Sequence, residues 1–413
     1  MFSHAEIVLA EVWRFTHSAD GVLSRYFRAH HALGHADRGV IAETVFDTLR
    51  HRRTLEARCR VNAGMVTPRR LLLAALARRQ RGKARNAPAD TDERAWLARA
   101  ENFDETTLSP AERLELPDWL HERLHSTHGE ETRALAEALN RPAPLDLRVN
   151  TIRQSRKAVL ARLAAERIAA TPGRFSPFAI RLEGKPALTR HPLFLSGTIE
   201  TQDEGSQLLG LLLNPKRGET VADFCAGAGG KTLLLGALMR GSGQLYAFDV
   251  SEKRLAGLKS RLERSGLSNV HPQWLESERD AKVKRLAGKF DKVLVDAPCS
   301  GLGTLRRNPD LKWRQTPETI TEFARRQAAI LVAAATLARP GGRLVYATCS
   351  LLPEENDAIV DAFLTTHPAF CERSAGEALR RFGWTETETR LRLLPHRHGT
   401  DGFFAALLER QGP

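Results

Sequence analysis

The chain is poor in cysteine, and none of its apolar runs is long. Its 413 residues include only five cysteines, which are widely spaced and form no C-x-x-C pair. This pattern argues against a disulfide framework and against a zinc site, so we expect no bound metal and a reducing, cytoplasmic location. A membrane span needs about 18 consecutive apolar residues, and no run approaches that length. The segment Met1–Ile7 also lacks the basic region and apolar stretch of a secretory signal.

Acidic residues are fewer than basic ones, with 49 Asp and Glu against 62 Lys and Arg and a formal net charge of +13. Residues 52–85 hold eleven basic residues and a single acid, Glu56. Residues 306–314 form a second basic stretch, which contains Trp313. Arginine pairs with phosphates and stacks on bases, so this clustering favours nucleic acid as the partner. The alternative explanation is a GC-rich genome that favours arginine codons.

A glycine-rich turn at residues 225–232 lies between an apolar segment and a predicted helix at 233–239. Strand, tight turn and helix are the layout of a nucleotide-type site in a parallel sheet. A Walker A phosphate loop needs glycine where Cys225 stands, which argues against an ATPase. A second apolar segment, residues 244–249, ends in Asp249, whose carboxylate suits the two ribose hydroxyls of a nucleoside. Dinucleotides and S-adenosylmethionine are both compatible with this pattern.

The chain divides into three predicted parts. Residues 1–140 have apolar residues at helical spacing and no catalytic constellation, which favours a helical binding module. Residues 141–205 begin at a proline-rich boundary and contain short strands with one amphipathic helix, which indicates a small α/β subdomain. Residues 206–413 alternate strands and helices, which predicts a doubly wound parallel sheet.

Two cysteines and an aspartate lie at the ends of predicted strands of this sheet. Asp296 and Cys299 end one apolar strand, and Cys349 lies at the end of another. Ligands of open α/β sheets bind at the carboxyl ends of the strands, so we expect all three side chains to face one cleft. The other cysteines are interpreted as packing or buried residues: Cys59, Cys225 and Cys371.

Cysteines beside a methyl donor suit the methylation of a pyrimidine. Carbon 5 of the ring is a poor nucleophile, but addition of a thiolate to carbon 6 enables carbon 5 to take a methyl group from a sulfonium. A base then removes the proton from carbon 5, and the thiol is eliminated. Asp296 can hold the exocyclic amine and ring nitrogen of cytosine, and the second cysteine can act as a general acid or base in release.

Several motifs carry a family resemblance. They are the segments Asp223–Thr232, Asp296–Gly301, Arg307–Asp310, Tyr346–Ser350 and Glu354–Asn356, with Pro144–Asn150, Gln202–Ser206 and Asp401–Phe404. This series resembles the Sun/Fmu family of RNA cytosine-5 methyltransferases. Asp37–Arg50 is similar to part of a NusB-type RNA-binding domain, as in the RsmB type. The resemblance implies an α/β fold with a Rossmann-like class I methyltransferase sheet, preceded by a small α/β (RRM-like) subdomain and an all-α NusB-like domain.

The resemblance also implies site residues. Cys349 matches the nucleophile and Cys299 the cysteine used in release, with Asp296 beside them. The positions that match the S-adenosylmethionine site are Cys225, Ala226, Gly227, Ala228, Gly229, Gly230, Lys231, Asp249 and Asp296. The sequence departs from the family at Ala228, where proline is usual, and it lacks the usual Gly-Asp pair that holds the adenine. Glu276 and Asp280 are the candidates for that contact.

The expected activity is therefore methyl transfer from S-adenosylmethionine to carbon 5 of a cytosine in RNA, with small-subunit ribosomal RNA as the substrate that the RsmB likeness implies. We expect a monomer with no membrane partner. One alternative is a DNA cytosine-5 methyltransferase, in which the nucleophile would be Cys299. The other is a non-catalytic RNA-binding factor of ribosome assembly that kept the fold, against which the presence of Cys349, Asp249 and Asp296 argues.

Overall fold

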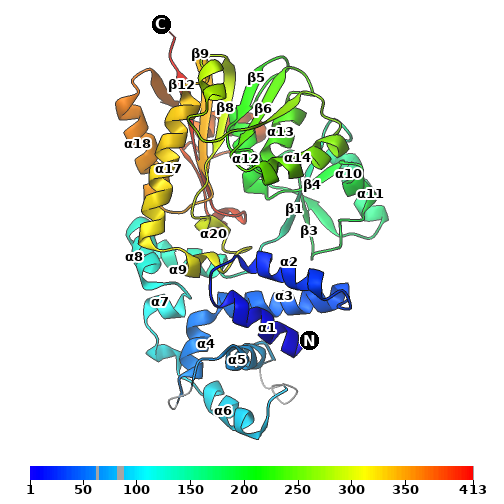
Figure 1. Cartoon of the computed structure of the whole chain (residues 1–413), viewed down its shortest axis with the longest axis vertical. Coiled ribbons are helices and arrows are strands. Elements are labelled where there is room, and N and C mark those ends of the chain that lie inside the picture. Colours follow the sequence, from blue (N-terminus) through cyan, green and yellow to red (C-terminus); the bar gives the residue numbers. More distant parts are fainter. Residues whose placement is uncertain (62–64, 81–87, 413) are drawn as a thin grey trace. The chain divides into compact units, whose positions relative to one another are not determined.

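The computed structural model of the chain describes residues 1–61, 65–80 and 88–412. It divides into two compact units (Figure 1). The first consists of Met1–Pro142 with Thr304–Pro317, and the second of Ala143–Gly303 with Glu318–Pro413. Within the described ranges, no helix has the length and apolar character needed to cross a membrane.

The first unit is helical, as predicted for the N-terminal part of the chain. Its helices are α1 (Phe2–Val12), α2 (Ala19–Ala29), α3 (His35–Arg50), α4 (Arg52–Cys59), α5 (Pro68–Gln80), α6 (Thr91–Glu101), α7 (Pro110–Arg113), α8 (Asp118–His128), α9 (Thr132–Leu139) and α16 (Leu311–Arg314), with short 3-10 turns at Glu105–Thr107 and Gly129–Glu131. Apolar residues at helical spacing bury one face of each core helix, such as Val8 and Leu9 on α1 and Val45 and Leu49 on α3.

Most of the described basic residues in the stretch 52–85 are engaged in ion pairs. The sequence shows one acid within residues 52–85, but the fold brings acids from other helices to the same place. The described arginines that pair with carboxylates are Arg52, Arg53, Arg58, Arg60, Arg69, Arg78 and Arg79. Arg81, Lys83 and Arg85 lie outside the described residues. The described part of this stretch is therefore partly neutralised within its own unit.

The second basic stretch also has a structural role. Lys312 is buried, and its Nζ donates to Arg50 O at 3.2 Å and to Asn140 Oδ1 at 2.7 Å. Burial lowers the pKa of Lys312 to about 7. Trp313 donates its Nε1–H to Leu49 O at 2.9 Å and packs against the helical core. These two residues hold α16 in the helical unit, and the expected contact of the stretch 306–314 with nucleic acid stays a prediction.

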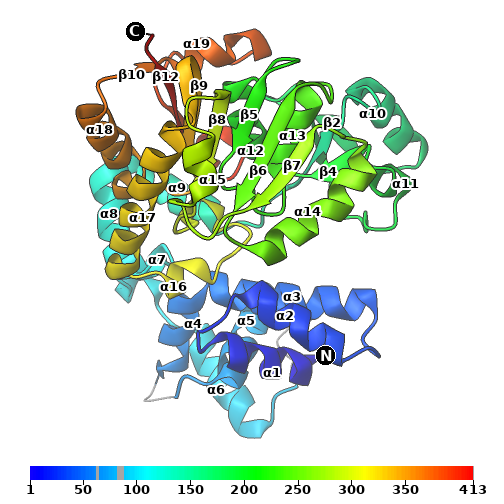
Figure 2. The same ribbon diagram turned by 45° about the horizontal axis from the view of Figure 1, so that its top comes forward.

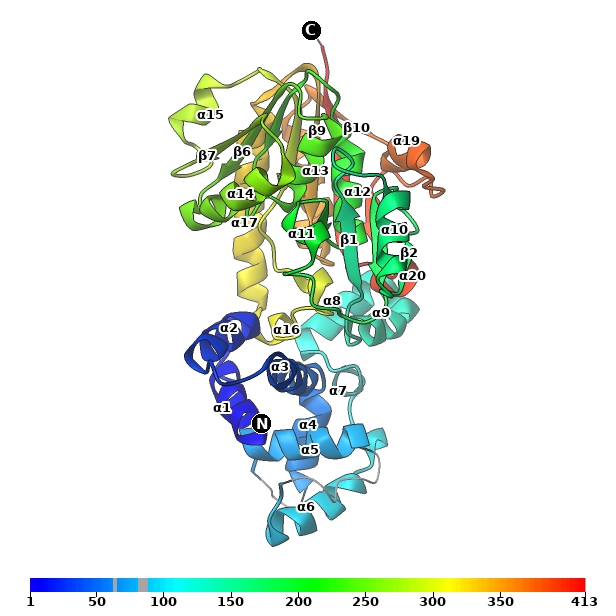
Figure 3. The same ribbon diagram turned by 90° about the vertical axis from the view of Figure 1, so that its right-hand side faces the viewer.

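The second unit contains two sheets. The small one has the order β2-β3-β1-β4, with β1 (Leu145–Val149), β2 (Ala170–Pro172), β3 (Ala179–Leu182) and β4 (Ile199–Thr201). All its pairs are antiparallel. The helices α10 (Arg156–Ala165) and α11 (Pro192–Leu195) accompany it, and α10 lies beside it in Figure 3. Leu147, Val159 and Ile180 are among its fully buried core residues.

The large sheet has the order β10-β12-β9-β8-β5-β6-β7 (Figure 2). In addition, β11 pairs with β12. Its strands are β5 (Thr220–Asp223), β6 (Gln244–Asp249), β7 (Val270–Trp274), β8 (Phe290–Asp296), β9 (Ala338–Thr348), β10 (Phe370–Arg373), β11 (Leu391–Leu393) and β12 (Phe403–Arg410). Its helices are α12 (Glu204–Leu213), α13 (Gly230–Leu238), α14 (Glu252–Ser265), α15 (Ala281–Arg285), α17 (Pro317–Ala335), α18 (Asp357–Thr366), α19 (Ala375–Leu379) and α20 (Pro395–His398). Short 3-10 turns lie at Leu302–Thr304, Pro353–Glu355 (η6) and Arg380–Phe382.

The strands β7, β6, β5, β8 and β9 run parallel, which confirms the predicted doubly wound sheet. The chain leaves β5 toward β6 and β7 and returns on the other side of β5 with β8 and β9. This reversal of strand order places a crevice outside the carboxyl ends of β5 and β8. The strand ends that carry the predicted site residues therefore meet at one edge.

Candidate active site at the strand carboxyl ends

A cavity of about 800 Å³ opens at this edge, and residues of the second unit line it. The predicted site residues in its wall are Cys225, Ala226, Gly227, Ala228, Gly230, Lys231, Asp249, Asp296, Cys299 and Cys349. Gly229 is not in the wall. It has φ of 84°, and a Cβ there would collide with Leu258 of α14, so glycine is needed for packing.

The glycine turn is held between β5 and β6. Gly227 has φ of 56° and donates its backbone N–H to Asp249 Oδ2 at 2.7 Å. Asp249 Oδ1 accepts from Ser251 N at 2.7 Å. The carboxylate at the end of β6 is thus fixed by two backbone donors, and each oxygen keeps a further lone pair for a ligand hydroxyl.

Asp223, at the end of β5, stabilises the glycine turn through a hydrogen bond with α13. Its Oδ2 accepts from Thr232 Oγ1 at 2.7 Å, which ties the end of β5 to the first turn of α13. The side chain is fully buried, and burial raises the pKa of Asp223 to about 7. The hydrogen bond from Thr232 opposes this shift, and the nearby carboxylate of Asp296 adds to it.

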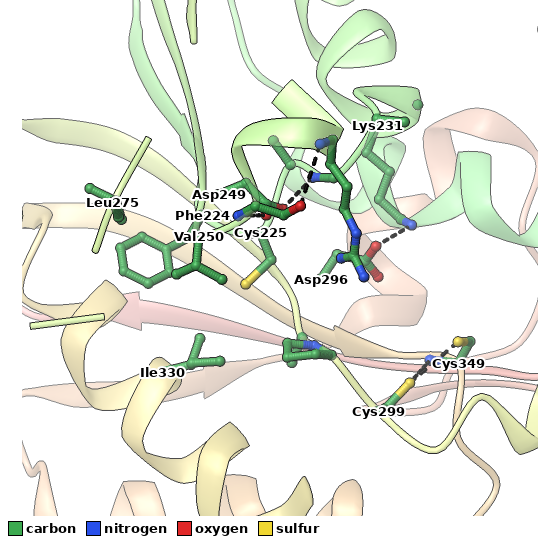
Figure 4. Close-up of a pocket in the computed structure, with 18 of the residues that line it drawn as sticks. Phe224, Cys225, Lys231, Asp249, Val250, Leu275, Asp296, Cys299, Ile330 and Cys349 are labelled. Carbon is green, nitrogen blue, oxygen red and sulfur yellow. Dashed lines mark hydrogen bonds and ion pairs between the residues drawn. The ribbon is translucent and has the colours of Figure 1, made fainter. Parts of the chain in front are cut away.

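An ion pair lies between the glycine turn and the cysteines. Lys231 Nζ lies 2.6 Å from Asp296 Oδ2, and Figure 4 shows the two side chains pointing toward each other. Burial acts to lower the pKa of Lys231, but the Asp296 carboxylate outweighs it and leaves that pKa raised. The ammonium group therefore remains charged at neutral pH beside the carboxylate.

The two strand-end cysteines lie side by side (Figure 4). Their Sγ atoms are 3.3 Å apart, and Cys349 donates its backbone N–H to Cys299 Sγ at 3.3 Å. Contact with Cys349, followed by burial, raises the pKa of Cys299 well above its usual range. The neutral thiol of Cys299 can therefore donate its hydrogen to the sulfur of Cys349. This pairing brings together residues that are fifty positions apart in the sequence.

The remaining cysteines do not belong to the thiol pair. Burial raises the pKa of the Cys225 thiol well above its usual range, and the side chain lines the cavity and packs against the apolar core of the sheet. Burial also raises the pKa of Cys59, to about 12. Cys371 donates its Sγ–H to Glu409 O at 3.6 Å at the edge of the sheet. Neither Cys59 nor Cys371 lines the cavity.

The two candidates for the adenine contact are separated by the structure. Glu276 lines the cavity, whereas Asp280 does not. The Asp280 carboxylate accepts from Glu276 N at 3.0 Å and from Lys282 N at 2.8 Å, so it caps α15. Of the two acids, only Glu276 lies in the cavity wall, and its contact with the adenine stays a prediction.

Several residues of the cavity wall were not predicted. Val250 and Leu275 directly follow the ends of β6 and β7, a position that could have indicated them. Arg326 and Ile330 come from the middle of α17, where no local signal marks them. Arg148 of β1 donates from Nη1 to Gly230 O at 2.5 Å, and burial lowers its pKa to about 10. The small sheet thus supports the turn through a contact that only the fold reveals.

The described part of the chain contains no group of His, Cys, Asp or Glu side chains arranged to hold a metal ion. The cavity wall contains the glycine turn, carboxylates, Lys231, the paired thiols and apolar side chains. Such a set can hold a nucleoside-type ligand at β5 and β6 and carry out thiol chemistry at β8 and β9.

The chain is similar to proteins of known families. The family model described as 16S rRNA methyltransferase RsmB/F matches residues 210–409, and one described as a methyltransferase RsmF/B-like, ferredoxin-like domain matches residues 116–189. The probable ribosomal RNA small subunit methyltransferase B of Synechocystis sp. is 39% identical over 318 residues, which cover 75% of this chain and 70% of that protein.

Solved structures show the same fold. The crystal structure of PH0851 superimposes with a TM-score of 0.80 at 27% identity and covers 99% of both chains. A methyltransferase homologue from Pyrococcus horikoshii is 33% identical, with a TM-score of 0.63, and the match covers 73% of this chain and 100% of that one.

Proposed function

This chain belongs to the RsmB/F family of 16S rRNA methyltransferases, and we propose that it methylates carbon 5 of a cytosine in small-subunit ribosomal RNA through a covalent bond to Cys349. The observation that carries the proposal is the pair of thiols, 3.3 Å apart, in the wall of a nucleoside-type cavity. One thiol can add to the cytosine ring, and the other can assist the elimination that frees the methylated base from the protein. A single ring held at this point would lie within reach of both.

The methyl donor of the family is S-adenosylmethionine, and the residues of the cavity suit it. Asp249 offers free lone pairs to two ribose hydroxyls, and the apolar side chains Val250 and Leu275 offer a wall for a flat base. Glu276 lies where a carboxylate can accept from an exocyclic amine. When bound, this donor supplies an electrophilic methyl group on a sulfonium.

The roles of the two cysteines follow from their surroundings. Cys299 stays protonated because contact with Cys349 and burial raise its pKa, which makes it a poor nucleophile and leaves its S–H in place beside the Cys349 sulfur. Cys349, as the thiolate, then forms the bond to carbon 6, and the electron pair of the 5,6 double bond attacks the methyl group from carbon 5, while the carbon–sulfur electrons stay with the donor. A base takes the proton from carbon 5, the 5,6 double bond re-forms, and Cys349 leaves as the thiolate, to which the S–H of Cys299 donates a hydrogen bond.

Asp296 and Lys231 complete the site for the base. The carboxylate of Asp296, at the end of β8, can accept from the exocyclic amine of cytosine. Lys231 holds that carboxylate at 2.6 Å and places a positive charge beside the position where negative charge develops on the ring. A uracil would present a carbonyl to Asp296, so the pair favours cytosine.

For the first unit we propose a role in binding ribosomal RNA, because the segment Asp37–Arg50 resembles part of a NusB-type RNA-binding domain. The described arginines of its stretch 52–85 are largely paired with acids, so we propose that it recognises RNA shape more than bulk charge. The exposed arginines of such pairs remain able to exchange partners for phosphates.

The two cysteine variants test the mechanism. Cys349→Ala should abolish the formation of 5-methylcytosine in small-subunit ribosomal RNA. Cys299→Ala should form a protein–RNA adduct that survives denaturing electrophoresis, because addition proceeds while release is blocked. Cys371→Ala, outside the cavity, is the matched control and should retain activity. Activity in Cys349→Ala together with its loss in Cys299→Ala would refute the assignment and indicate the arrangement of DNA cytosine-5 enzymes.

A further inference from the structure

A buried carboxylate lies beneath the two cysteine loops and outside the cavity. Glu355, in η6, has 0% exposure and is not part of the cavity wall. Its Oε1 accepts from Ser300 N at 2.8 Å and from Gln327 Nε2 at 3.0 Å. Its Oε2 accepts from Ser300 Oγ at 2.5 Å and from Ser350 Oγ. One side chain therefore bonds to the residue that follows each of the two cysteines.

These contacts begin where the regular pairing of the strands ends. The ladder between β8 and β9 has its last pair at Asp296 and Ala347, and its last hydrogen bond runs from Ala297 N to Ala347 O at 2.9 Å. Cys299 and Cys349 both lie beyond it. Since no ladder holds the loops at that level, their spacing depends on cross-loop contacts, among which the bonds to Glu355 are charge-assisted.

Neighbouring side chains support the same carboxylate. Gln327 of α17 donates from Nε2 to Pro298 O at 3.0 Å as well as to Glu355. Asn356 donates from Nδ2 to Ser350 O at 3.1 Å and accepts from Thr348 Oγ1 at 2.5 Å. The polar groups under both cysteines thus form one connected network with Glu355 at its centre, and loss of one member leaves others unpaired in a dry environment.

We propose that Glu355 is a positioning residue that sets the spacing of the two thiols, and thereby the passage from addition at Cys349 to release at Cys299. This inference rests on the proposed function of the site. Glu355 does not line the cavity, so it contacts neither the methyl donor nor the target base. A change at Glu355 should therefore affect the steps that use both cysteines. The binding of the methyl donor, at the other end of the cavity, should not change.

The variants Glu355→Ala and Glu355→Gln distinguish positioning from general stability. The alanine removes all four acceptor contacts. The glutamine keeps the shape, and its Nε2 can donate to the hydroxyls of Ser300 and Ser350, which rotate to accept. We expect Glu355→Ala to lower kcat by about 100-fold, the size of effect that a misplacement of about 1 Å produces. Glu355→Gln should retain most of the wild-type kcat.

The matched control is Glu204→Gln, another buried carboxylate of the same unit. Glu204 Oε1 accepts from Phe175 N and Ser176 N at 2.6 and 2.9 Å, and Glu204 is not part of the cavity wall. Its variant carries the general cost of changing a buried carboxylate without touching the two thiols. We expect the kcat of Glu204→Gln to stay within about 2-fold of wild type.

Three measurements are made on the full chain with transcribed small-subunit ribosomal RNA: kcat and KM for methylation, the Kd of S-adenosylmethionine by titration calorimetry, and the fraction of covalent adduct on denaturing gels. Glu355→Ala should keep the KM for RNA and the Kd within about 2-fold, and its adduct fraction should rise above that of wild type. Ser350→Ala removes one donor to the Glu355 carboxylate and should also raise the adduct fraction and lower kcat, to a smaller degree. This variant replaces Glu355→Ala in the test if Glu355→Ala does not fold.

A wild-type kcat in Glu355→Ala and Ser350→Ala would overturn the inference. A parallel loss of kcat and of S-adenosylmethionine binding in these variants would also overturn it, because that pattern indicates general unfolding. Failure of the wild-type chain to form 5-methylcytosine would refute the proposed function itself, a result that is distinct from both.

Discussion

Replacing Asp223 by asparagine should remove a pH dependence from the stability of the glycine turn. Asp223 lies at the end of β5, is fully buried, and has a pKa raised by burial to about 7. In the unfolded chain its pKa is near the ordinary value of 3.8. Between these two values the folded state holds a proton that the unfolded state has lost. The contribution of Asp223 to stability is therefore present in acid and is lost as pH rises from about 4 through 7.

The size of this loss follows from the two pKa values. One pKa unit corresponds to about 1.4 kcal/mol, and between pH 5 and pH 8 the linkage relation gives a loss of roughly 2 to 3 kcal/mol. The asparagine of Asp223→Asn cannot titrate, although its Oδ1 can still accept from Thr232. Its unpaired amide adds a cost of about 1 to 3 kcal/mol that does not vary with pH. Stability in Asp223→Asn should therefore be lower at pH 5 and should converge on wild type, or exceed it, at pH 8.

Hydrogen exchange of the backbone amides in β5 and α13, followed by mass spectrometry, measures the local opening free energy. The difference between wild type and Asp223→Asn should change by roughly 2 to 3 kcal/mol between pH 5 and pH 8. Asp291→Asn, on neighbouring β8, is the control. The pKa of Asp291 is lowered in the folded state, so its contribution to the free energy of unfolding is lost only at acidic pH, below the range of this experiment. Profiles of wild type and Asp223→Asn that stay parallel across this range would refute the reasoning.

Two further predictions concern the cavity. Lys231→Met and Asp296→Asn should each lower kcat/KM for methyl transfer, and the double variant should be little worse than either single variant. The expected coupling energy is about 1.5 to 3 kcal/mol, because each group holds the other at 2.6 Å. Additive losses in kcat/KM would show that the ion pair does not act as one unit. Treatment with diamide should link Cys299 to Cys349 and abolish activity, since their Sγ atoms at 3.3 Å need to move only about 1.3 Å to form a disulfide. Dithiothreitol should restore that activity, and Cys371→Ser should behave as wild type; free, alkylatable thiols at both positions after oxidation would contradict this prediction.

Much of the site could be predicted because its residues follow strands directly. Asp249, Asp296 and Cys349 each lie at or just beyond the end of an apolar run that reads as a buried strand. Parallel strands of one sheet expose their carboxyl ends at the same edge, so strand-end residues gather without any knowledge of the packing. The same rule would have found Val250 and Leu275.

Charge and support were harder to predict because both depend on distant partners. The arginines of α4 and α5 appeared as an unpaired basic cluster, but Glu93, Glu105 and Asp47 reach them from other helices. The choice between Glu276 and Asp280 needed the fold as well, since Asp280 is used to cap α15. A one-dimensional count of charge cannot show which acids the tertiary structure brings near.

The sequence by itself determined the alternating strands and helices, the glycine turn and the presence of two strand-end cysteines, because hydrophobic periodicity and glycine placement are local properties. Only the tertiary structure decided the distance between Cys299 and Cys349, the engagement of Lys312 and Trp313 in the helical unit, and the contacts of Glu355 with both cysteine loops. These features join residues separated by tens to hundreds of positions, and their geometry is set by how the elements pack. Local spacing along the chain carries no measure of that packing.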